Sequence, residues 1–351
     1  MHPALQTRAC ELFGVRRPVV QTGMGWVSGA RLTSATANAG GLGILASATM
    51  TYDELARAIA EVKSRTSEPF GVNLRADAAD VVQRIDLMAR EGVRVASFAL
   101  APKQDLIARC KDHGMVVMPS IGARRHAEKV AGWGADAVIV QGGEGGGHTG
   151  QVPTTVLLPQ VVDAVDIPVI AAGGFFDGRG LVAALAYGAA GIAMGTRFLL
   201  TSDSAVSDVV KQVYLGKGVT DTVVTREVDG MPHRVLRTPL VDALERRRAT
   251  GRLARSARSA VSFQRMSGIP WRQMVSEGLA MKRSGELSWS QTLMAANTPM
   301  LLKAAMVDGR PDLGVMASGQ VVGLLDDLPS CAELLDRIER EATEVLEWFC
   351  A

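Results

Sequence analysis

The chain has 351 residues, enough for one large domain or two smaller ones, and its 47% hydrophobic and 21% charged residues are typical of a globular enzyme and exclude extensive disorder. A formal net charge of +2, from 38 basic and 36 acidic residues, gives no indication of a nucleic-acid partner or of binding to a charged membrane surface. The four cysteines are scattered and form no Cys/His ligand pair, so we expect neither a metal site nor a disulfide framework.

The N-terminal residues MHPALQTRACELFGV are polar where a signal peptide would need an apolar stretch. No apolar run of about 18 residues, the length that crosses a bilayer, follows in the chain. Because scattered cysteines are also typical of a reducing compartment, these features predict a cytoplasmic protein without a membrane partner.

Apolar, β-rich runs recur between Pro18 and about Leu200, each followed by turn residues and an amphipathic stretch of roughly ten to fifteen residues. The runs are continuous rather than alternating, as in strands of a parallel sheet that are buried on both faces. Eight such strands predict a TIM (β/α)8 barrel. A doubly wound open sheet would also alternate strands and helices, but no GxGxxG motif follows the first strand. The predicted strands are residues 19–22, 43–47, 70–74, 95–100, 116–121, 137–141, 168–173 and 191–196.

The pattern changes after Leu200 to long helical periodicities without repeated strands. We therefore expect a barrel over residues 1–202 and a C-terminal helical addition over residues 203–315 that serves as a substrate or lid region. The final segment, residues 316–351, is expected to pack back on the barrel.

The loop after the sixth predicted strand runs from Gln141 to Gly150 with the sequence QGGEGGGHTG. In a (β/α)8 barrel the loops at the carboxyl ends of the strands form the active site. Glycines allow the backbone to approach a ligand closely, and an imidazole titrates near neutral pH. The pattern favours His148 as a catalytic acid or base, and the alternative is a flexible loop with an incidental surface histidine.

The next two loops predict an anion site. Gly173 and Gly174 follow the seventh strand, and Gly195 and Thr196 follow the eighth. Backbone N–H groups at the helix starts beyond these strands commonly bind phosphate in barrels of this type. Two alternatives stay open, namely a barrel that binds a phosphorylated metabolite without a flavin, and glycines that serve only tight turns.

Taken together, the motifs resemble those of one enzyme family. VVQTGMGW, FGVN, QGGEGGGHTG, AAGGFFDGRG and MGTRFL occur in that order between residues 18 and 200, and SGQ follows at residues 318–320. The set is similar to that of the nitronate monooxygenase family, formerly called 2-nitropropane dioxygenases, and also resembles flavin-dependent enoyl-acyl-carrier-protein reductases. The resemblance implies FMN as the cofactor, and it leaves open whether NADH or NADPH serves as an electron partner.

The resemblance also assigns roles to individual residues. His148 would face the reactive side of the flavin as proton donor or acceptor, because a flavin carries the electrons and leaves positioning and proton transfer to the protein. A flavin-binding sensor without turnover would use the same cofactor contacts and is a further alternative. The resemblance implies that Thr22, Gly23 and Met24 contact the flavin ring and that Asn73 and Gln141 contact its polar edge. It also implies contacts from Gly146 and Gly147 in the glycine loop, and contacts to the phosphate from Gly173, Gly174, Gly195 and Thr196.

Departures from the family pattern argue against a nitroalkane substrate. Gly23-Met24-Gly25-Trp26 replaces the usual Pro-Met after the first strand, and Gly145 stands where Ala is common. The segments QTGMGWVSGARL, IVQGGEGGGHTG and SWSQTLMAANTPMLLKAAMVDG are most similar to an actinobacterial branch of sterol-ring catabolism that acts on CoA thioesters. The resemblance therefore implies dehydrogenation of a ring beside a carbonyl in a CoA thioester. Oxidation of alkyl nitronates with O₂ and NAD(P)H-dependent enoyl reduction are the alternatives.

Arginines cluster between Arg246 and Arg258, and guanidinium groups suit the phosphates of CoA. A solvated basic helix face is the simpler explanation of the same cluster. The family resemblance and the apolar C-terminal region also suggest a homodimer. The candidate substrate contacts are Trp26, Lys103, Arg246, Arg247 and Arg248.

Overall fold

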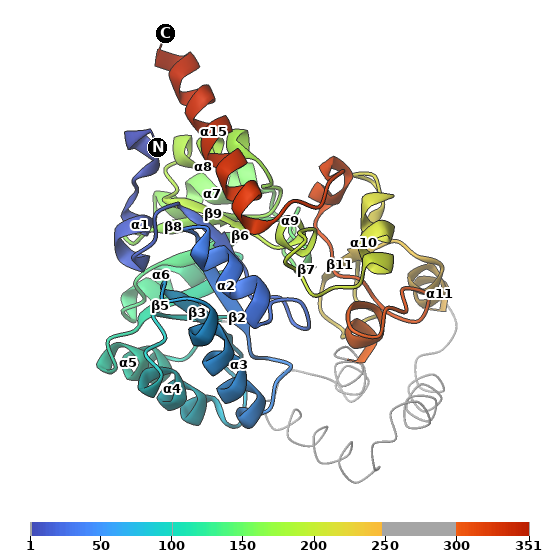
Figure 1. The fold of residues 1–351 in the computed structure, drawn as a ribbon, viewed down its shortest axis with the longest axis horizontal. Coiled ribbons are helices and arrows are strands. Elements are labelled where there is room, and N and C mark those ends of the chain that lie inside the picture. The colour runs from blue at the N-terminus through green and yellow to red at the C-terminus, as the bar shows by residue number, and fades with distance from the viewer. Residues whose placement is uncertain (1, 100, 248–299, 351) are drawn as a thin grey trace.

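The computed structural model describes residues 2–99, 101–247 and 300–350, and these residues form a closed barrel of parallel strands surrounded by helices (Figure 1). The barrel closes because β1 pairs with β2 on one side and with β9 on the other. The fold class and all eight predicted strands are confirmed. The barrel strands are β1 (Val19–Gln21), β2 (Leu42–Ala46), β3 (Phe70–Leu74), β4 (Val95–Phe98), β5 (Val116–Ile121), β6 (Val138–Gln141), β8 (Val169–Ala172) and β9 (Gly191–Met194).

The barrel wall has one apolar layer inside it and another outside it. Successive side chains of a strand point to opposite sides, so Ile44 packs inside the barrel with Val20 and Val95, whereas the next residue, Leu45, packs in the layer under the helices. This double burial explains why the strands are continuous apolar runs in the sequence.

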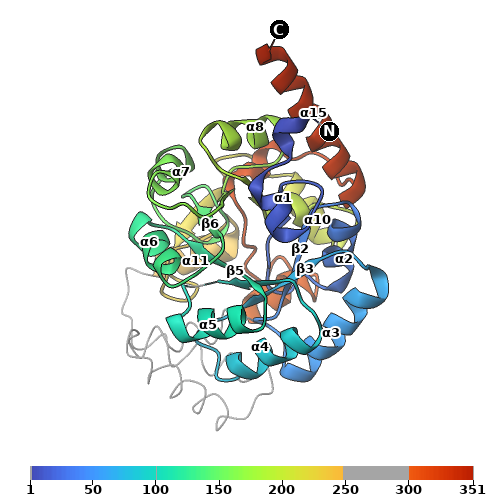
Figure 2. The same cartoon turned by 90° about the vertical axis from the view of Figure 1, so that its left-hand side faces the viewer.

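Helices α2 to α8 surround the strands (Figure 2). Their sequences explain where they begin and which face they bury: α3 starts with a capping box between Thr51 and Glu54, and it buries Leu55, Ile59 and Val62 at helical spacing. The helices are α1 (Arg8–Phe13), α2 (Ala30–Asn38), α3 (Tyr52–Arg65), α4 (Val81–Arg90), α5 (Gln104–Asp112), α6 (Arg124–Gly132), α7 (Thr154–Val162), α8 (Gly178–Ala186), α9 (Thr196–Leu199), α10 (Asp208–Leu215), α11 (Pro239–Arg247) and α15 (Cys331–Cys350), with 3₁₀ turns η1 (Pro3–Leu5) and η2 (Gln320–Leu324).

A second, antiparallel sheet lies beside the barrel. It consists of β10 (Thr222–Thr225), β11 (His233–Leu236) and β7 (Gly147–His148), with β11 in the middle. The expectation of an addition without strands is therefore wrong for the part around β10 and β11, because four-residue strands give too short an alternation to stand out from helical periodicity. The domain boundaries at residues 202 and 315 stay predictions.

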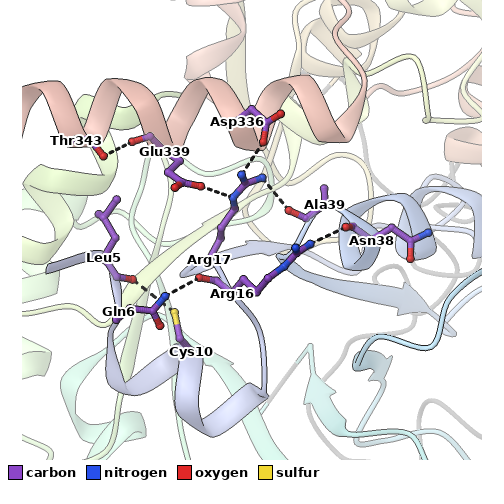
Figure 3. Close-up of polar contacts among 10 residues, drawn as sticks. All are labelled: Leu5, Gln6, Cys10, Arg16, Arg17, Asn38, Ala39, Asp336, Glu339 and Thr343. Atoms are coloured by element: carbon purple, nitrogen blue, oxygen red, sulfur yellow. Dashed lines mark hydrogen bonds and ion pairs between the residues drawn. The ribbon is translucent and has the colours of Figure 1, made fainter. Parts of the chain in front are cut away.

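Helix α15 packs against α8 and α2 on the outside of the barrel. Arg17, just before β1, connects it to the barrel (Figure 3): its guanidinium donates to Glu339 at 2.7 Å, to Asp336 at 2.6 Å and to the carbonyl of Ala39 at 2.9 Å. None of the helices in the described ranges has the length and apolar character needed to span a membrane.

Candidate active site

The loop after β1 is closed by the hydroxyl of Ser28. This hydroxyl donates to the carbonyl of Thr22 at 2.8 Å and accepts hydrogen bonds from the amide of Met24 at 2.9 Å and from Gln21 Nε2 at 2.8 Å. The bonds fix the predicted flavin-facing residues Thr22, Gly23 and Met24 at the carboxyl end of the barrel.

This loop lies between the ends of β9 and β3. A Cβ atom on Gly195 would approach Thr22 Oγ1 to 3.2 Å and Met24 Sδ to 3.4 Å, and a Cβ atom on Gly23 would overlap the side chain of Asn73. Asn73 is buried and donates through Nδ2 to the hydroxyl of Ser97 at 3.2 Å. The structure therefore brings these predicted residues together in one place.

The glycine-rich loop after β6 folds back on its own strand. Gln141 Nε2 donates to the carbonyl of His148 at 2.8 Å and to that of Gly146 at 3.3 Å, so this amide holds the loop in shape. A Cβ atom on Gly146 would lie 2.5 Å from the amide nitrogen of Gly319 and 2.5 Å from the carbonyl carbon of Ser318. Glycine is required here because another part of the chain passes so close.

The ends of β8 and β9 offer backbone N–H groups. Gly173 and Gly174 have φ of +100° and +86°, values that favour glycine. The amides of Gly174 and Gly195 have no hydrogen-bond partner among the described residues. Thr196 adds a hydroxyl that accepts from the Gly319 amide at 2.9 Å. Gly195 stands at the start of α9, and free amides together with a hydroxyl fit the phosphate of a mononucleotide.

His148 lies beside two residues of the addition. Strand β7 pairs with β11 so that His148 is opposite His233, and their ring centroids are 4.7 Å apart. His148 Nε2 is 2.5 Å from Asp229 Oδ2, and His233 Nδ1 is 3.5 Å from the same oxygen. The His148 side chain is 52% exposed, whereas those of Asp229 and His233 are 7% and 3% exposed. A half-exposed imidazole on a buried carboxylate is an arrangement suited to proton transfer.

Burial opposes ionisation of Asp229, but its hydrogen bond with His148 and the imidazole of His233, 3.5 Å away, outweigh this effect and hold the pKa of the carboxyl well below its usual range. Both ring nitrogens of the buried His233 are without a hydrogen-bond partner in the described part of the chain. The two imidazoles and the carboxylate form a compact cluster, in which one ring nitrogen or carboxylate oxygen of each residue lies within 4.8 Å of those of the other two.

The candidate substrate residues are less closely grouped. Trp26 lies in the loop after β1 with φ of +65°, a strained value for a bulky residue, and Lys303 Nζ is 5.9 Å from its ring centroid. Lys103 is exposed at the start of α5, and Arg246 is exposed on α11. The side chain of Arg247 and all of Arg248 lie outside the described residues.

Sequence reasoning missed Asp229 and left His233 without a role. Both come from the segment DGMPHRV, which the prediction assigned to a helical addition. The signal that could have found them is an aspartate four residues before a histidine and a short apolar run. This sequence pattern indicates the site only when β11 is known to pair with β7, because that pairing brings the two residues to His148.

Comparison with known proteins agrees with this geometry. The family model for nitronate monooxygenase matches residues 6–84 and 78–341. The chain belongs to the nitronate monooxygenase family. It is an oxidoreductase, and the resemblance stated from its motifs is confirmed.

Two relatives are similar over nearly the whole chain. One, from Mycobacterium tuberculosis, is 68% identical over 346 residues and covers 98% of both chains. The other, from Rhodococcus jostii, is 65% identical over 343 residues and covers 98% of this chain and 97% of its own. Both are named as a (3aS,4S,5R,7aS)-5-hydroxy-7a-methyl-1-oxo-octahydro-1H-indene-4-carboxyl-CoA dehydrogenase.

Among solved structures, FabK from Thermotoga maritima is 33% identical with a TM-score of 0.79, and the match covers 98% of each chain. Family membership supports a flavin cofactor, and the free amides of Gly174 and Gly195 fit the phosphate of one.

Proposed function

We propose that the chain is an FMN-dependent dehydrogenase that introduces a double bond into a ring beside the thioester carbonyl of a bicyclic CoA substrate. The observation that carries the proposal is the 68% identity, over 98% of both chains, to a relative named as a dehydrogenase of such a carboxyl-CoA compound. Binding of FMN in particular is supported by the free amides of Gly174 and Gly195 beside the hydroxyl of Thr196, since such groups commonly bind a phosphate.

The reaction removes one proton and one hydride from neighbouring carbons. The C–H bond next to a thioester carbonyl is acidic because the carbonyl delocalises the charge, so a base at that carbon is the first requirement. His148 meets it, since its imidazole is half-exposed at the carboxyl end of the barrel. A flavin held at Thr22, Gly174 and Gly195 would supply the acceptor for the hydride of the adjacent carbon.

The other residues position these groups. Gln141 holds the backbone of His148 through a 2.8 Å hydrogen bond, and Ser28 holds the loop that carries Thr22 and Met24. Trp26, in the same loop, is proposed to contact the substrate rings, because a strained aromatic residue beside a binding site is often kept for recognition. NAD⁺ or NADP⁺ is the proposed acceptor that reoxidises the cofactor.

An anaerobic absorbance titration tests the proposal. The CoA thioester that names the relatives is expected to bleach the bound flavin and lose two hydrogens, whereas an alkyl nitronate leaves it oxidised. The His148→Ala variant should still bind flavin, but the CoA thioester should reduce that flavin about 100- to 10,000-fold more slowly than in wild type, because general acid–base catalysis usually contributes this much to a rate. His126→Ala on α6 is the matched control and should react as wild type.

Family membership also favours a second candidate, oxidation of alkyl nitronates with O₂. Flavin reduction by the nitronate but not by the CoA thioester would support this candidate and overturn the first. Bleaching by NADPH or NADH, followed by reoxidation with an enoyl thioester alone, would instead indicate a reductase. A purified protein that binds no FMN would contradict all three.

A further inference from the structure

We infer that Asp229 is a positioning residue that holds His148 in the tautomer protonated on Nε2, so that Nδ1 is the nitrogen that takes the proton from the substrate. The inference rests on the proposed role of His148 as the base. It adds the residue that orients the base and the atom at which the proton is transferred.

Backbone contacts hold the carboxylate of Asp229 against the ring of His148. Asp229 Oδ2 lies 2.5 Å from His148 Nε2, and Asp229 Oδ1 accepts the amide of Met231 at 3.0 Å. The second bond fixes the carboxylate, so its direction is set by the backbone of the loop before β11. Because the β7–β11 pairing also fixes His148 opposite His233, backbone contacts hold both partners of the 2.5 Å contact in place.

The charge of Asp229 decides which ring nitrogen of His148 carries the hydrogen. An ionised carboxylate only accepts hydrogen bonds, so the nitrogen that faces it must carry the hydrogen. Asp229 is buried, and its hydrogen bonds hold its pKa well below its usual range, which keeps it ionised at neutral pH. Nδ1 of His148 then keeps its lone pair, and when it accepts a proton the resulting imidazolium lies against a negative charge.

The other charged groups near the His148 ring are bonded elsewhere, so Asp229 is the carboxylate that contacts this ring. His233, on β11, lies beside both groups: its Nδ1 is 3.5 Å from the same carboxylate oxygen, and its ring centroid is 4.7 Å from that of His148. The neighbouring Arg234 is turned away, because its guanidinium donates to the carbonyl of Gly143 at 2.8 Å. Glu144, in the loop of His148 itself, accepts from the amide and hydroxyl of Thr154 at 3.0 and 2.8 Å. The carboxylate of Asp229 is therefore the group that sets the tautomer.

The test combines turnover with a direct measurement of the tautomer. In FMN-loaded wild-type enzyme labelled with ¹⁵N-histidine, the His148 resonances, assigned by comparison with His148→Ala, should show hydrogen on Nε2. In Asp229→Asn, the amide can donate to Nε2 and shift the hydrogen to Nδ1. The expected loss in kcat is about 100- to 10,000-fold, by analogy with the same change in the serine-protease triad, with KM changed less than about threefold.

Asp242→Asn serves as the matched control, because Asp242 forms an ion pair with Arg237 in the same region and should leave kcat and the His148 resonances unchanged. A wild-type His148 with hydrogen on Nδ1 would overturn the inference without any variant having to fold. Full turnover of Asp229→Asn together with a large loss in His148→Ala would also overturn it while leaving the proposed function intact. Full turnover of His148→Ala would instead refute the role of His148 in the proposed function itself.

Discussion

The close approach of Gly146 to the segment Ser318–Gly319 allows a quantitative prediction. The Cβ atom of Gly146→Ala would lie 2.5 Å from two backbone atoms, 0.9 Å inside the 3.4 Å at which ordinary contact begins. The backbone must therefore move by about 1 Å, which typically costs about 1 to 3 kcal/mol for an overpacked site. Since the Gly319 amide donates to Thr196, this movement disturbs the proposed phosphate site.

The expected result is weaker flavin binding. If the cost falls on the bound state, 1 to 3 kcal/mol corresponds to a rise in Kd of about 5- to 140-fold. The rise can be measured by titrating FMN into apoprotein and following the quenching of its fluorescence. Gly150→Ala is the matched control, because its Cβ atom would meet nothing nearer than 3.9 Å. An unchanged Kd in Gly146→Ala, or equal weakening in both variants, would refute the reasoning.

Two further predictions concern stability and are checked by urea unfolding. Arg17→Met removes the contacts with two carboxylates of α15 and should lower the free energy of unfolding by about 1 to 3 kcal/mol. The control Arg340→Met, whose carboxylate partner is 3.9 Å away and exposed, should change this free energy by less than about 0.5 kcal/mol. Equal losses in the two variants would contradict the prediction. Although burial opposes its ionisation, Asp229 has a native pKa below its ordinary 3.8, so its stabilising contribution is present above about pH 4 and lost as the pH falls through the native pKa. Wild type should accordingly lose stability more steeply than Asp229→Asn as the pH falls below about 4, and parallel unfolding free energies of the two proteins in that range would contradict the prediction.

The barrel could be predicted from the sequence because its signals are local. Each strand is buried on both faces, as Ile44 and Leu45 illustrate, so each appears as a continuous apolar run with a turn at its end. The glycine turns that we propose as the phosphate site were predictable for the same reason. Gly173 and Gly195 directly follow strands, and the carboxyl ends of the strands meet at one face of the barrel.

The partners of His148 could not be predicted because their contact is not local. Asp229 is 81 residues away from His148 in the chain, and the two meet only through the pairing of β7 with β11. Strand β7 has two residues, too few for any periodicity, and its first residue is a glycine. The role of Gln141 in holding the loop was likewise hidden, because the sequence shows a polar side chain at a strand end but not whether it turns toward a ligand or toward its own backbone.

The sharing of one small sheet between the barrel and the addition has a consequence for how this enzyme can change. Strand β7 belongs to a barrel loop, but its hydrogen-bonding partner, β11, comes from the addition. Substitutions in residues 222–236 can therefore alter the orientation and the chemical partner of His148 while every barrel strand and every proposed phosphate contact stays the same. A chimera that keeps this barrel and takes the addition of another family member is expected to bind the same cofactor but to exchange protons with a different substrate.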